Sequence, residues 1–252
     1  MNIGIIGAGR MGCSLARAIV HAGHSVKLAN ARGPDTIGAL ASDLGAVAVT
    51  VRDAVQRVDI VILSIPQGAI GQLPAGLFDD VPQEVIVVDT GNYYPGLRDQ
   101  RIAAIEEGMA ESLWVSQMLK RPVVKAFNTI GFTSLANEAR PSPARKRIAL
   151  PVAGHDPAAR AVVMTLLDEI GFDGVDAGPL EESWRQQPGT PTYCTDLDRA
   201  GVIQALAIAG KSHAPARRDQ FIQQMLLLTR QGAAPDLISL GRSIYGAPAA
   251  RT

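Results

Sequence analysis

The chain has 252 residues, in which 24 lysines and arginines balance 24 aspartates and glutamates, so the formal net charge is zero. Hydrophobic residues account for 47% of the sequence and charged residues for 19%, as in a protein with a sizeable core. The absence of a net positive charge argues against nucleic acid as a partner. Cys13 and Cys194 are too few for a disulfide framework and the four histidines are scattered, so we expect no metal site.

Strand and helix patterns alternate along most of the chain. Short apolar runs, typical of buried parallel strands, are separated by segments of helical periodicity. This alternation predicts an α/β fold, a doubly wound parallel Rossmann sheet covered by helices on both faces. In chain order we predict a strand at 2–6, a helix at 10–22, a strand at 25–29, a helix at 34–44, strands at 46–49, 58–64 and 85–89, a helix at 99–107, strands at 123–127 and 147–153, a helix at 157–170, a strand at 172–176 and helices at 197–209 and 216–230.

The N-terminus leads directly from Met1 into the first predicted strand, without the basic leader and cleavage region of a secretory signal. No apolar run reaches the roughly 18–20 residues that a membrane-spanning helix requires. We therefore expect a cytoplasmic protein that has no membrane partner.

A glycine-rich loop follows the first predicted strand and opens the first predicted helix, and this context makes the G-x-G-x-x-G pattern a strong signal for a dinucleotide. Gly7 permits the tight turn, Gly9 lets the backbone approach the pyrophosphate, and Gly12 lets the helix pack closely on the strand. The helix N-terminus offers free N–H groups and a positive dipole end to the phosphates. The predicted cofactor-binding loop consists of Gly7, Ala8, Gly9, Arg10, Met11 and Gly12.

The end of the second predicted strand distinguishes NAD from NADP. NAD-binding proteins commonly place Asp or Glu there, which binds the ribose hydroxyls and would repel a 2′-phosphate. This chain has Asn30, which donates hydrogen bonds without a negative charge, and Arg32, which can pair with a phosphate. We therefore predict NADP(H) as the cofactor, with Asn30 and Arg32 binding its 2′-phosphate and Arg10 adding to the positive field.

The ligand of an open α/β sheet lies beyond the carboxyl ends of the strands, and three of these ends carry small polar groups. Ile65 and Pro66 are predicted to brace the nicotinamide ring. Asn128 and Thr129 are predicted to contact the carboxamide or the substrate, and we assign the catalytic role to them. The other predicted cofactor-binding residues at these strand ends are Ser64, Gly91, Asn92 and Ala126.

No Ser/His/Asp order, tyrosine–lysine pair or carboxylate pair stands out in the sequence as a source of acid–base catalysis. Hydride transfer to a flavin-like ring needs little proton chemistry from the protein, which must mainly hold two rings face to face. The sequence therefore favours an NADPH-dependent oxidoreductase whose partner is a small-molecule redox substrate with a flavin-like ring, bound beside the nicotinamide.

The chain resembles the NADP-dependent reductases of the deazaflavin coenzyme and the related cytoplasmic oxidoreductase domain of the six-transmembrane STEAP metalloreductases. The resemblance implies NADPH in the Rossmann cleft and a flavin-type electron partner stacked on the nicotinamide. In those families a Ser-Arg pair after the second strand binds the 2′-phosphate, whereas this chain has Asn30 and Ala31, with Arg32 one position later. Residues 181–193 and the helices beyond them depart from the family pattern. The segments that carry the likeness are residues 2–12, 59–66, 123–130, 151–156 and 176–180.

The strand pattern fades after about residue 178, so we divide the chain into a Rossmann NADP-binding domain, residues 1–180, and a helical C-terminal segment, residues 181–252. The C-terminal segment is expected to pack on the same domain or at a dimer interface. We expect a homodimer in which helices pair between subunits.

Two other functions remain open at this stage. One is reduction of a small imine or carbonyl substrate, because pyrroline-carboxylate reductases and β-hydroxyacid dehydrogenases share the N-terminal pattern. The dehydrogenases would require a catalytic lysine on a helix after the Rossmann domain, where Lys211 is the only lysine beyond position 146. The other is a regulatory protein that binds NADP(H) without turnover.

Overall fold

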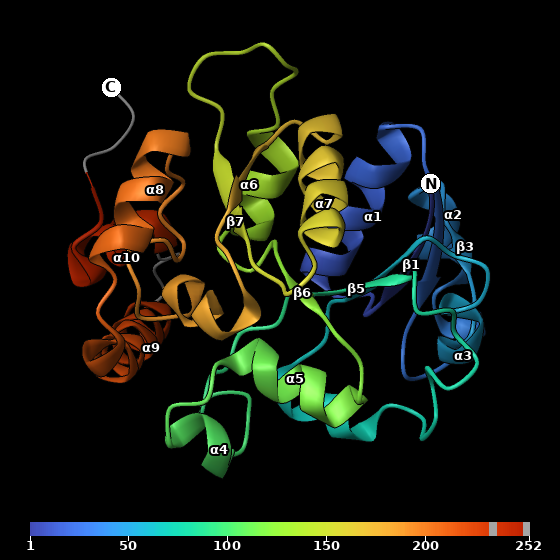
Figure 1. The fold of residues 1–252 in the computed structure, drawn as a ribbon, viewed down its shortest axis with the longest axis horizontal. Helices are drawn as coiled ribbons and strands as arrows, with labels where there is room; N and C mark the ends of the chain where they lie inside the picture. The colour runs from blue at the N-terminus through green and yellow to red at the C-terminus, as the bar shows by residue number, and fades with distance from the viewer. Residues whose placement is uncertain (232–235, 249–252) are drawn as a thin grey trace.

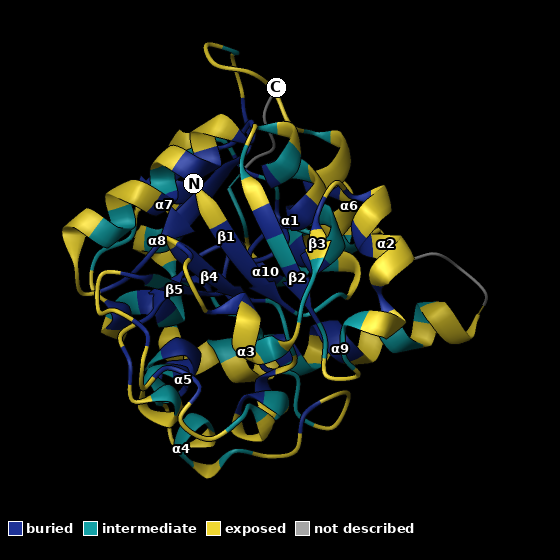
Figure 2. Ribbon diagram, turned by 90° about the vertical axis from the view of Figure 1, so that its right-hand side faces the viewer, coloured by how far each residue is buried: buried dark blue, intermediate teal, exposed yellow. Residues whose placement is uncertain are grey.

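Six short apolar segments pair side by side in parallel, in the order β3-β2-β1-β4-β5-β6. The computed structural model describes residues 1–231 and 236–248. The chain starts in the middle of the sheet, at β1, and β4 lies on the side of β1 opposite to β2 and β3, which is the predicted doubly wound Rossmann topology (Figure 2). These strands are β1 (Asn2–Ile6), β2 (Ser25–Ala29), β3 (Val47–Ala48), β4 (Ile60–Leu63), β5 (Ile86–Asp89) and β6 (Val124–Lys125).

Helices cover both faces of the sheet. Apolar residues of α1, α2, α6 and α7 pack on one face, and those of α3 and α5 pack on the other. The helices are α1 (Arg10–His21), α2 (Gly38–Asp43), α3 (Val51–Ala54), α4 (Ala103–Glu106), α5 (Glu111–Leu119), α6 (Phe132–Asn137), α7 (Pro157–Glu169), α8 (Arg199–Ile208), α9 (Ala214–Arg230) and α10 (Leu237–Tyr245), with 3₁₀ helices at Pro34–Thr36, Gln67–Gln72, Leu180–Gln186 and Lys211–His213.

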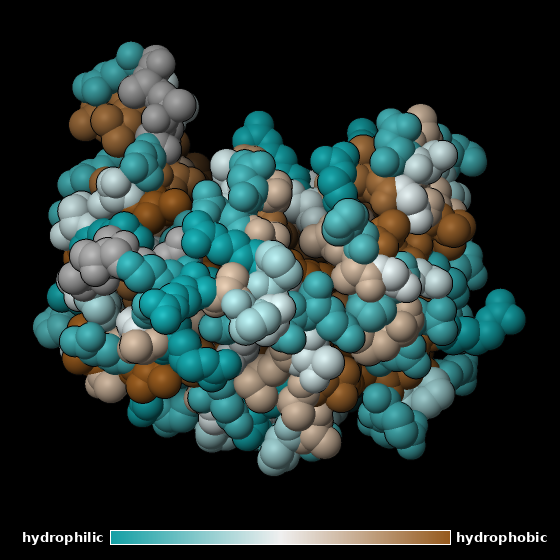
Figure 3. Space-filling model, turned by 90° about the horizontal axis from the view of Figure 1, so that it is seen from above, coloured by the Kyte–Doolittle hydropathy of each residue, from teal (hydrophilic) through white to brown (hydrophobic). Residues whose placement is uncertain are grey.

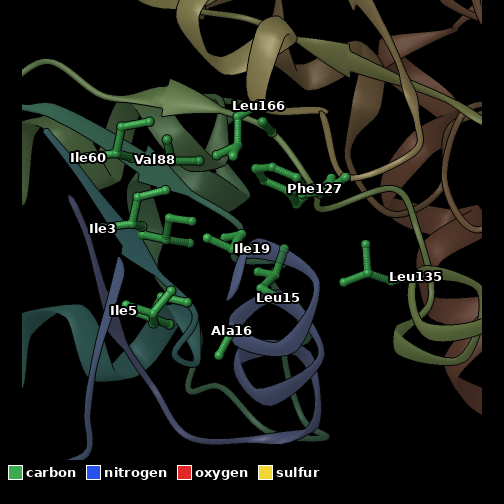
Figure 4. Packing of buried hydrophobic residues seen from close by; sticks show 14 of the residues in the cluster. Ile3, Ile5, Leu15, Ala16, Ile19, Ile60, Val88, Phe127, Leu135 and Leu166 are labelled. Atoms are coloured by element: carbon green, nitrogen blue, oxygen red, sulfur yellow. The ribbon is translucent and has the colours of Figure 1, made fainter. Parts of the chain in front are cut away.

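Successive side chains along each strand point to opposite faces of the sheet, so each face has its own hydrophobic core. Ile3 and Ile5 of β1 lie on the face where Leu15 of α1 packs (Figure 4). Ile6 and Leu63 belong to the cluster on the opposite face. Full burial of an aliphatic side chain of this size contributes about 1.5–3 kcal/mol. The central strands β4 and β5 are accordingly largely buried, whereas the edge strand β3 is partly exposed and the outer faces of the helices are exposed (Figure 2).

The seventh and eighth predicted strands exist, as β7 (Ala149–Val152) and β8 (Asp173–Asp176), but they do not extend the parallel order. They pair in parallel with each other. Among the described residues, an isolated antiparallel bridge between Lys125 and Ala153 joins them to the edge of the main sheet. The predicted doubly wound parallel sheet therefore consists of the first six strands, and β7 and β8 form a separate parallel pair, because apolar runs do not encode which strands pair.

The helix predictions fail mainly where polar residues are buried. Only Ala103–Glu106 of the predicted helix 99–107 is helical, because the Asp99 carboxylate is held in a turn by the backbone N–H groups of Gly68 and Tyr94. The helix Glu111–Leu119 was not predicted. Its first residues are polar yet buried, so it lacks the usual apolar stripe.

The helical C-terminal segment packs on the same chain at the β7–β8 side of the molecule (Figure 1). Val202 and Ala205 of α8 pack against Ala149 and Val175 of these strands. Phe221 of α9 contributes with other residues to a separate aromatic cluster. Residues 232–235 and 249–252 of the predicted segment lie outside the described residues.

The surface mixes polar and apolar residues on the face shown in Figure 3. Across residues 1–231 and 236–248, no helix combines the length and hydropathy needed to cross a membrane. The same residues contain no group of three or more His, Cys, Asp and Glu side chains that could bind a metal ion.

Candidate functional site

A cleft of about 390 Å³ lies beyond the carboxyl ends of β1, β4, β5 and β6, where a doubly wound sheet presents its ligand site. At one end is the glycine loop. At the other end lie aromatic residues from the loop after β5 and from the C-terminal segment. The predicted residues that line the cleft are Gly9, Arg10, Met11, Ser64, Ile65, Pro66, Gly91, Asn92 and Asn128.

The three glycines of the loop have different surroundings. Gly7 has a φ of +121°, and a Cβ there would lie 2.1 Å from the backbone oxygen of Ser64. A Cβ on Gly12 would lie 1.8 Å from the Gly7 oxygen, so both positions require glycine for backbone packing. A Cβ on Gly9 would meet no atom within 4 Å, so the space in front of Gly9 is open. This open space is where the predicted pyrophosphate would be bound.

The 12-residue helix α1 starts at Arg10, directly behind this space, and no side chain caps its first turn. Its free N–H groups and positive dipole end suit phosphate oxygens. The Arg10 guanidinium lies over the Phe132 ring, 5.2 Å from its centroid, so the cation is held beside the loop.

At the end of β2, Asn30 organises the following turn. Its side-chain oxygen accepts a hydrogen bond from the backbone N–H of Arg32 at 3.0 Å, and its amide donates to Thr36 Oγ1 at 3.0 Å. The Arg32 side chain is exposed and has no ion pair or hydrogen bond with the described residues. Neither residue lines the cleft, which ends at the glycine loop. Arg32 thus offers an uncompensated cation outside that end of the cleft.

Buried charged residues hold the loop after β5 in place. Lys125 is fully buried, and its Nζ lies 3.2 Å from Asp89 Oδ2 and also donates to the Gly91 backbone oxygen. The other carboxylate oxygen of Asp89 accepts from the Gly91 N–H at 2.8 Å, and Ser112 Oγ donates to Oδ2 at 2.6 Å. Because Gly91 lines the cleft, this network positions the cleft wall.

Glu111 lies next to this network and is 2% exposed. Its Oε2 atom is 3.9 Å from Lys125 Nζ and has no hydrogen-bond partner. Burial raises the pKa of Glu111 to about 7, although the charge of Lys125 opposes the shift. The group is therefore a carboxyl that titrates near neutral pH beneath the site.

The predicted catalytic residues occupy the loop after β6. Asn128 Nδ2 donates to Asn92 Oδ1 at 3.1 Å and to the Gln186 backbone oxygen at 2.6 Å, so both amide hydrogens are bound within the protein. Thr129 and Ala126 are buried and do not line the cleft. The Thr129 backbone oxygen accepts from the Cys194 N–H at 2.9 Å and so joins this loop to the C-terminal segment.

The opposite end of the cleft contains residues that sequence reasoning did not assign to the site. Tyr94 and Arg98 come from the loop after β5, whereas Tyr193 and Cys194 come from the C-terminal segment. The Tyr94 and Tyr193 hydroxyls are in hydrogen-bond contact. No local motif marks them. The sequence feature that could have indicated Tyr94 is the pair of adjacent tyrosines, Tyr93 and Tyr94, after the end of β5.

Burial keeps the groups at this end protonated. It raises the pKa of the Cys194 thiol to about 12, so this cysteine is not a thiolate nucleophile at neutral pH. Burial also raises the pKa of Tyr94 well above its usual value, with the neighbouring Cys194 adding to the shift. The Tyr94 hydroxyl is therefore protonated and can donate a hydrogen bond over the physiological pH range.

Comparison with known proteins agrees with this geometry. A family model described as NADP oxidoreductase, coenzyme F420-dependent, matches residues 2–93. The protein YjhV of Escherichia coli strain K12 is 37% identical over 127 residues, which are 50% of this chain and 85% of that protein. The crystal structure of the hypothetical protein SMa0349 from Sinorhizobium meliloti is 30% identical, with a TM-score of 0.65, and covers 79% of this chain and 96% of that one.

A further crystal structure, of a candidate F420-dependent NADP reductase from Arthrobacter sp. FB24, shares the fold over 93% of this chain and 96% of its own. It is 20% identical, with a TM-score of 0.59. The family match ends at residue 93, so it contains the glycine loop but not Tyr94, Arg98 or Tyr193. The far end of the cleft is built from residues outside the matched region.

Proposed function

The chain belongs to the family of coenzyme F420-dependent NADP oxidoreductases, and we propose that it transfers a hydride between NADP(H) and a flavin-like or deazaflavin acceptor bound beside the nicotinamide. One observation carries the proposal. A single cleft joins the glycine loop, at Gly9, to a wall that contains Tyr94 and Tyr193. A nucleotide and a second planar ring could therefore occupy the same cavity, one at each end.

The nucleotide end fits NADP(H) in shape and charge. The open space at Gly9 and the uncapped start of α1 suit the pyrophosphate. The turn that Asn30 organises has no carboxylate side chain at the ribose position, and the exposed Arg32 is available to a 2′-phosphate. We assign the phosphates to these residues and the nicotinamide to the cleft wall formed by Ile65, Pro66 and other residues at the strand ends.

When bound, NADPH supplies the hydride. The protein's own contribution is to bind and orient the two rings, because the cleft is lined by no Asp, Glu, His or Lys among the described residues. Asn128 acts as a positioning residue here, since its amide is committed to Asn92 and Gln186. The Lys125–Asp89 pair fixes the Gly91 wall beneath the acceptor.

Anaerobic assay of NADPH consumption tests this function directly. The acceptor panel should contain a deazaflavin, FMN, riboflavin, a small cyclic imine and a small ketone. We expect oxidation of NADPH with the deazaflavin or a flavin, and little with NADH. The Gly9→Val protein is the matched control, because its side chain would fill the space that we assign to the pyrophosphate.

The other outcomes separate the alternatives. Turnover with only the imine or the ketone would assign the protein to the small-substrate reductases. Tight NADPH binding without oxidation by any acceptor would indicate a regulatory binding protein. Either result would refute the proposed acceptor class.

A further inference from the structure

Two tyrosines that are 99 residues apart in the sequence meet in the cleft, where the Tyr94 hydroxyl contacts the Tyr193 hydroxyl. Each hydroxyl carries one hydrogen, and such a contact uses only one of the two. In the part of the chain that the structure describes, neither hydroxyl has another hydrogen-bond partner. One hydroxyl hydrogen is thus left for a molecule bound in the cleft.

The charged residues of the cleft also favour a ligand that carries or acquires a negative charge. Its only charged lining residues among those described are Arg10, at the nucleotide end, and Arg98, beside the tyrosines. The Arg98 guanidinium lies 5.0 Å from the centroid of the Tyr94 ring. Asp99 is 3.5 Å from Arg98, but its carboxylate is buried outside the cleft and accepts hydrogen bonds from two backbone N–H groups. Among the described residues, no carboxylate lines this cleft.

We propose that the Tyr94–Tyr193 pair and Arg98 form a subsite that stabilises the negative charge an acceptor acquires when it receives a hydride. This inference rests on the proposed function. A hydride brings two electrons and one proton to a neutral acceptor, which becomes an anion until it takes a proton from solvent, while NADPH becomes NADP⁺. Donors aimed at the place where charge develops accelerate such a step, since they are already oriented before the reaction.

The subsite selects between classes of acceptor. A flavin, a deazaflavin or a ketone starts neutral and becomes negative, so Arg98 and the free hydroxyl hydrogen favour the product of hydride transfer. An imine reacts in its protonated form, which is positive and becomes neutral. A cleft with two arginines and no carboxylate repels that form. The acceptor class that fits is therefore one that is neutral before hydride transfer, such as a flavin, a deazaflavin or a ketone, rather than a protonated imine.

Single-turnover measurements on tyrosine variants test the subsite. The variants are Tyr94→Phe, Tyr193→Phe and the double replacement, and the readouts are the hydride-transfer rate and the NADPH dissociation constant. We expect the double variant to slow hydride transfer about 100-fold or more, as for the loss of one oriented donor, and each single variant to slow it less, because the remaining tyrosine keeps a hydroxyl hydrogen. NADPH affinity should stay within about twofold, which also shows that the variants are folded.

Tyr93→Phe is the matched control, because Tyr93 is fully buried outside the cleft and its hydroxyl accepts from the Ile102 N–H. Arg98→Gln should slow transfer to a flavin, whereas Arg101→Gln, at a side chain that is 75% exposed, should not. Wild-type rates in the double tyrosine variant and in Arg98→Gln would overturn the subsite while leaving the proposed function intact. Oxidation of NADPH by the imine alone would overturn both.

Discussion

Asn128 and Gln186 are joined by two reciprocal hydrogen bonds, one from the Asn128 amide to the Gln186 backbone and one from the Gln186 amide to the Asn128 side chain. Asn128 Nδ2 donates to the Gln186 backbone oxygen at 2.6 Å, and Gln186 Nε2 donates to Asn128 Oδ1 at 3.0 Å. Both residues are almost completely buried, and the contact joins the loop after β6 to the 3₁₀ helix Leu180–Gln186. This pair of hydrogen bonds is thus one of the polar connections between the Rossmann sheet and the C-terminal segment.

Removing either partner should destabilise the protein, because the other is left buried with unsatisfied polar atoms. We expect Asn128→Ala and Gln186→Ala each to lower the free energy of unfolding by about 1–3 kcal/mol. The double variant should lose less than the sum of the two. Chemical denaturation of the four proteins measures the cycle, with exposed Asn137→Ala as the control.

If turnover falls far more in Asn128→Ala than in Gln186→Ala, the catalytic role predicted from the sequence is retained; parallel losses support a positioning role.

Gly9 and Gly12 should respond in opposite ways to a side chain. Gly9→Val places its side chain in open space, so we expect loss of NADPH binding with a change in stability of less than about 1 kcal/mol. Gly12→Ala places a Cβ 1.8 Å from the Gly7 oxygen, so we expect a destabilised fold. Thermal unfolding and NADPH titration of both variants test this contrast. Unchanged NADPH affinity in folded Gly9→Val would show that the pyrophosphate binds elsewhere.

Arg32 should discriminate between the two nicotinamide cofactors. A charge-assisted hydrogen bond to a phosphate contributes about 1.5–3 kcal/mol, so Arg32→Ala should weaken NADPH binding about 10-fold or more. NADH, which lacks the 2′-phosphate, should bind with nearly unchanged affinity. Calorimetric titration of both nucleotides measures the difference, and Arg101→Ala serves as a control at another exposed arginine. Equal weakening of NADPH and NADH would argue against a 2′-phosphate contact.

Glu111 should make stability depend on pH. Its pKa is about 7 in the folded protein against an ordinary value of 4.5, so the folded state binds the proton more tightly than the unfolded chain. The carboxyl therefore destabilises the fold increasingly as pH rises from about 4.5 to 7, and the full cost remains above pH 7. The charged groups that face it are Lys125, Asp89 and Arg218.

The neutral variant Glu111→Gln should remove this dependence. Between pH 5 and pH 8 we expect its stability to rise relative to wild type by on the order of 2 kcal/mol, because one pKa unit corresponds to about 1.4 kcal/mol. Urea denaturation of both proteins at the two pH values measures the change. The histidines are the same in both proteins, so their contribution to the pH dependence cancels in the difference. A constant difference between the two proteins would show that Glu111 does not change protonation in this range.

The sequence identified the nucleotide half of the site because each of its parts is local. The turn at Gly7, the open position at Gly9 and the close packing at Gly12 all follow from one six-residue motif between a strand and a helix. The absence of a carboxylate directly after β2 is also a local feature, and it indicates Arg32 as the residue that binds a 2′-phosphate. Apolar runs predicted the strands, since burial on both faces of a parallel sheet leaves a continuous signature.

The sequence could not identify the acceptor half, because it is formed by residues that meet only after the chain has folded. Tyr94 and Tyr193 are separated by 99 residues, and neither belongs to a motif. Lys125 could have been an exposed cation at a sheet edge, and only the packing of α5 and β5 around it makes it a buried anchor of the Gly91 loop. Hydrophobic patterning and local turn chemistry therefore determined the sheet and its nucleotide loop, whereas the far wall of the cleft was decided by long-range packing that no local pattern encodes.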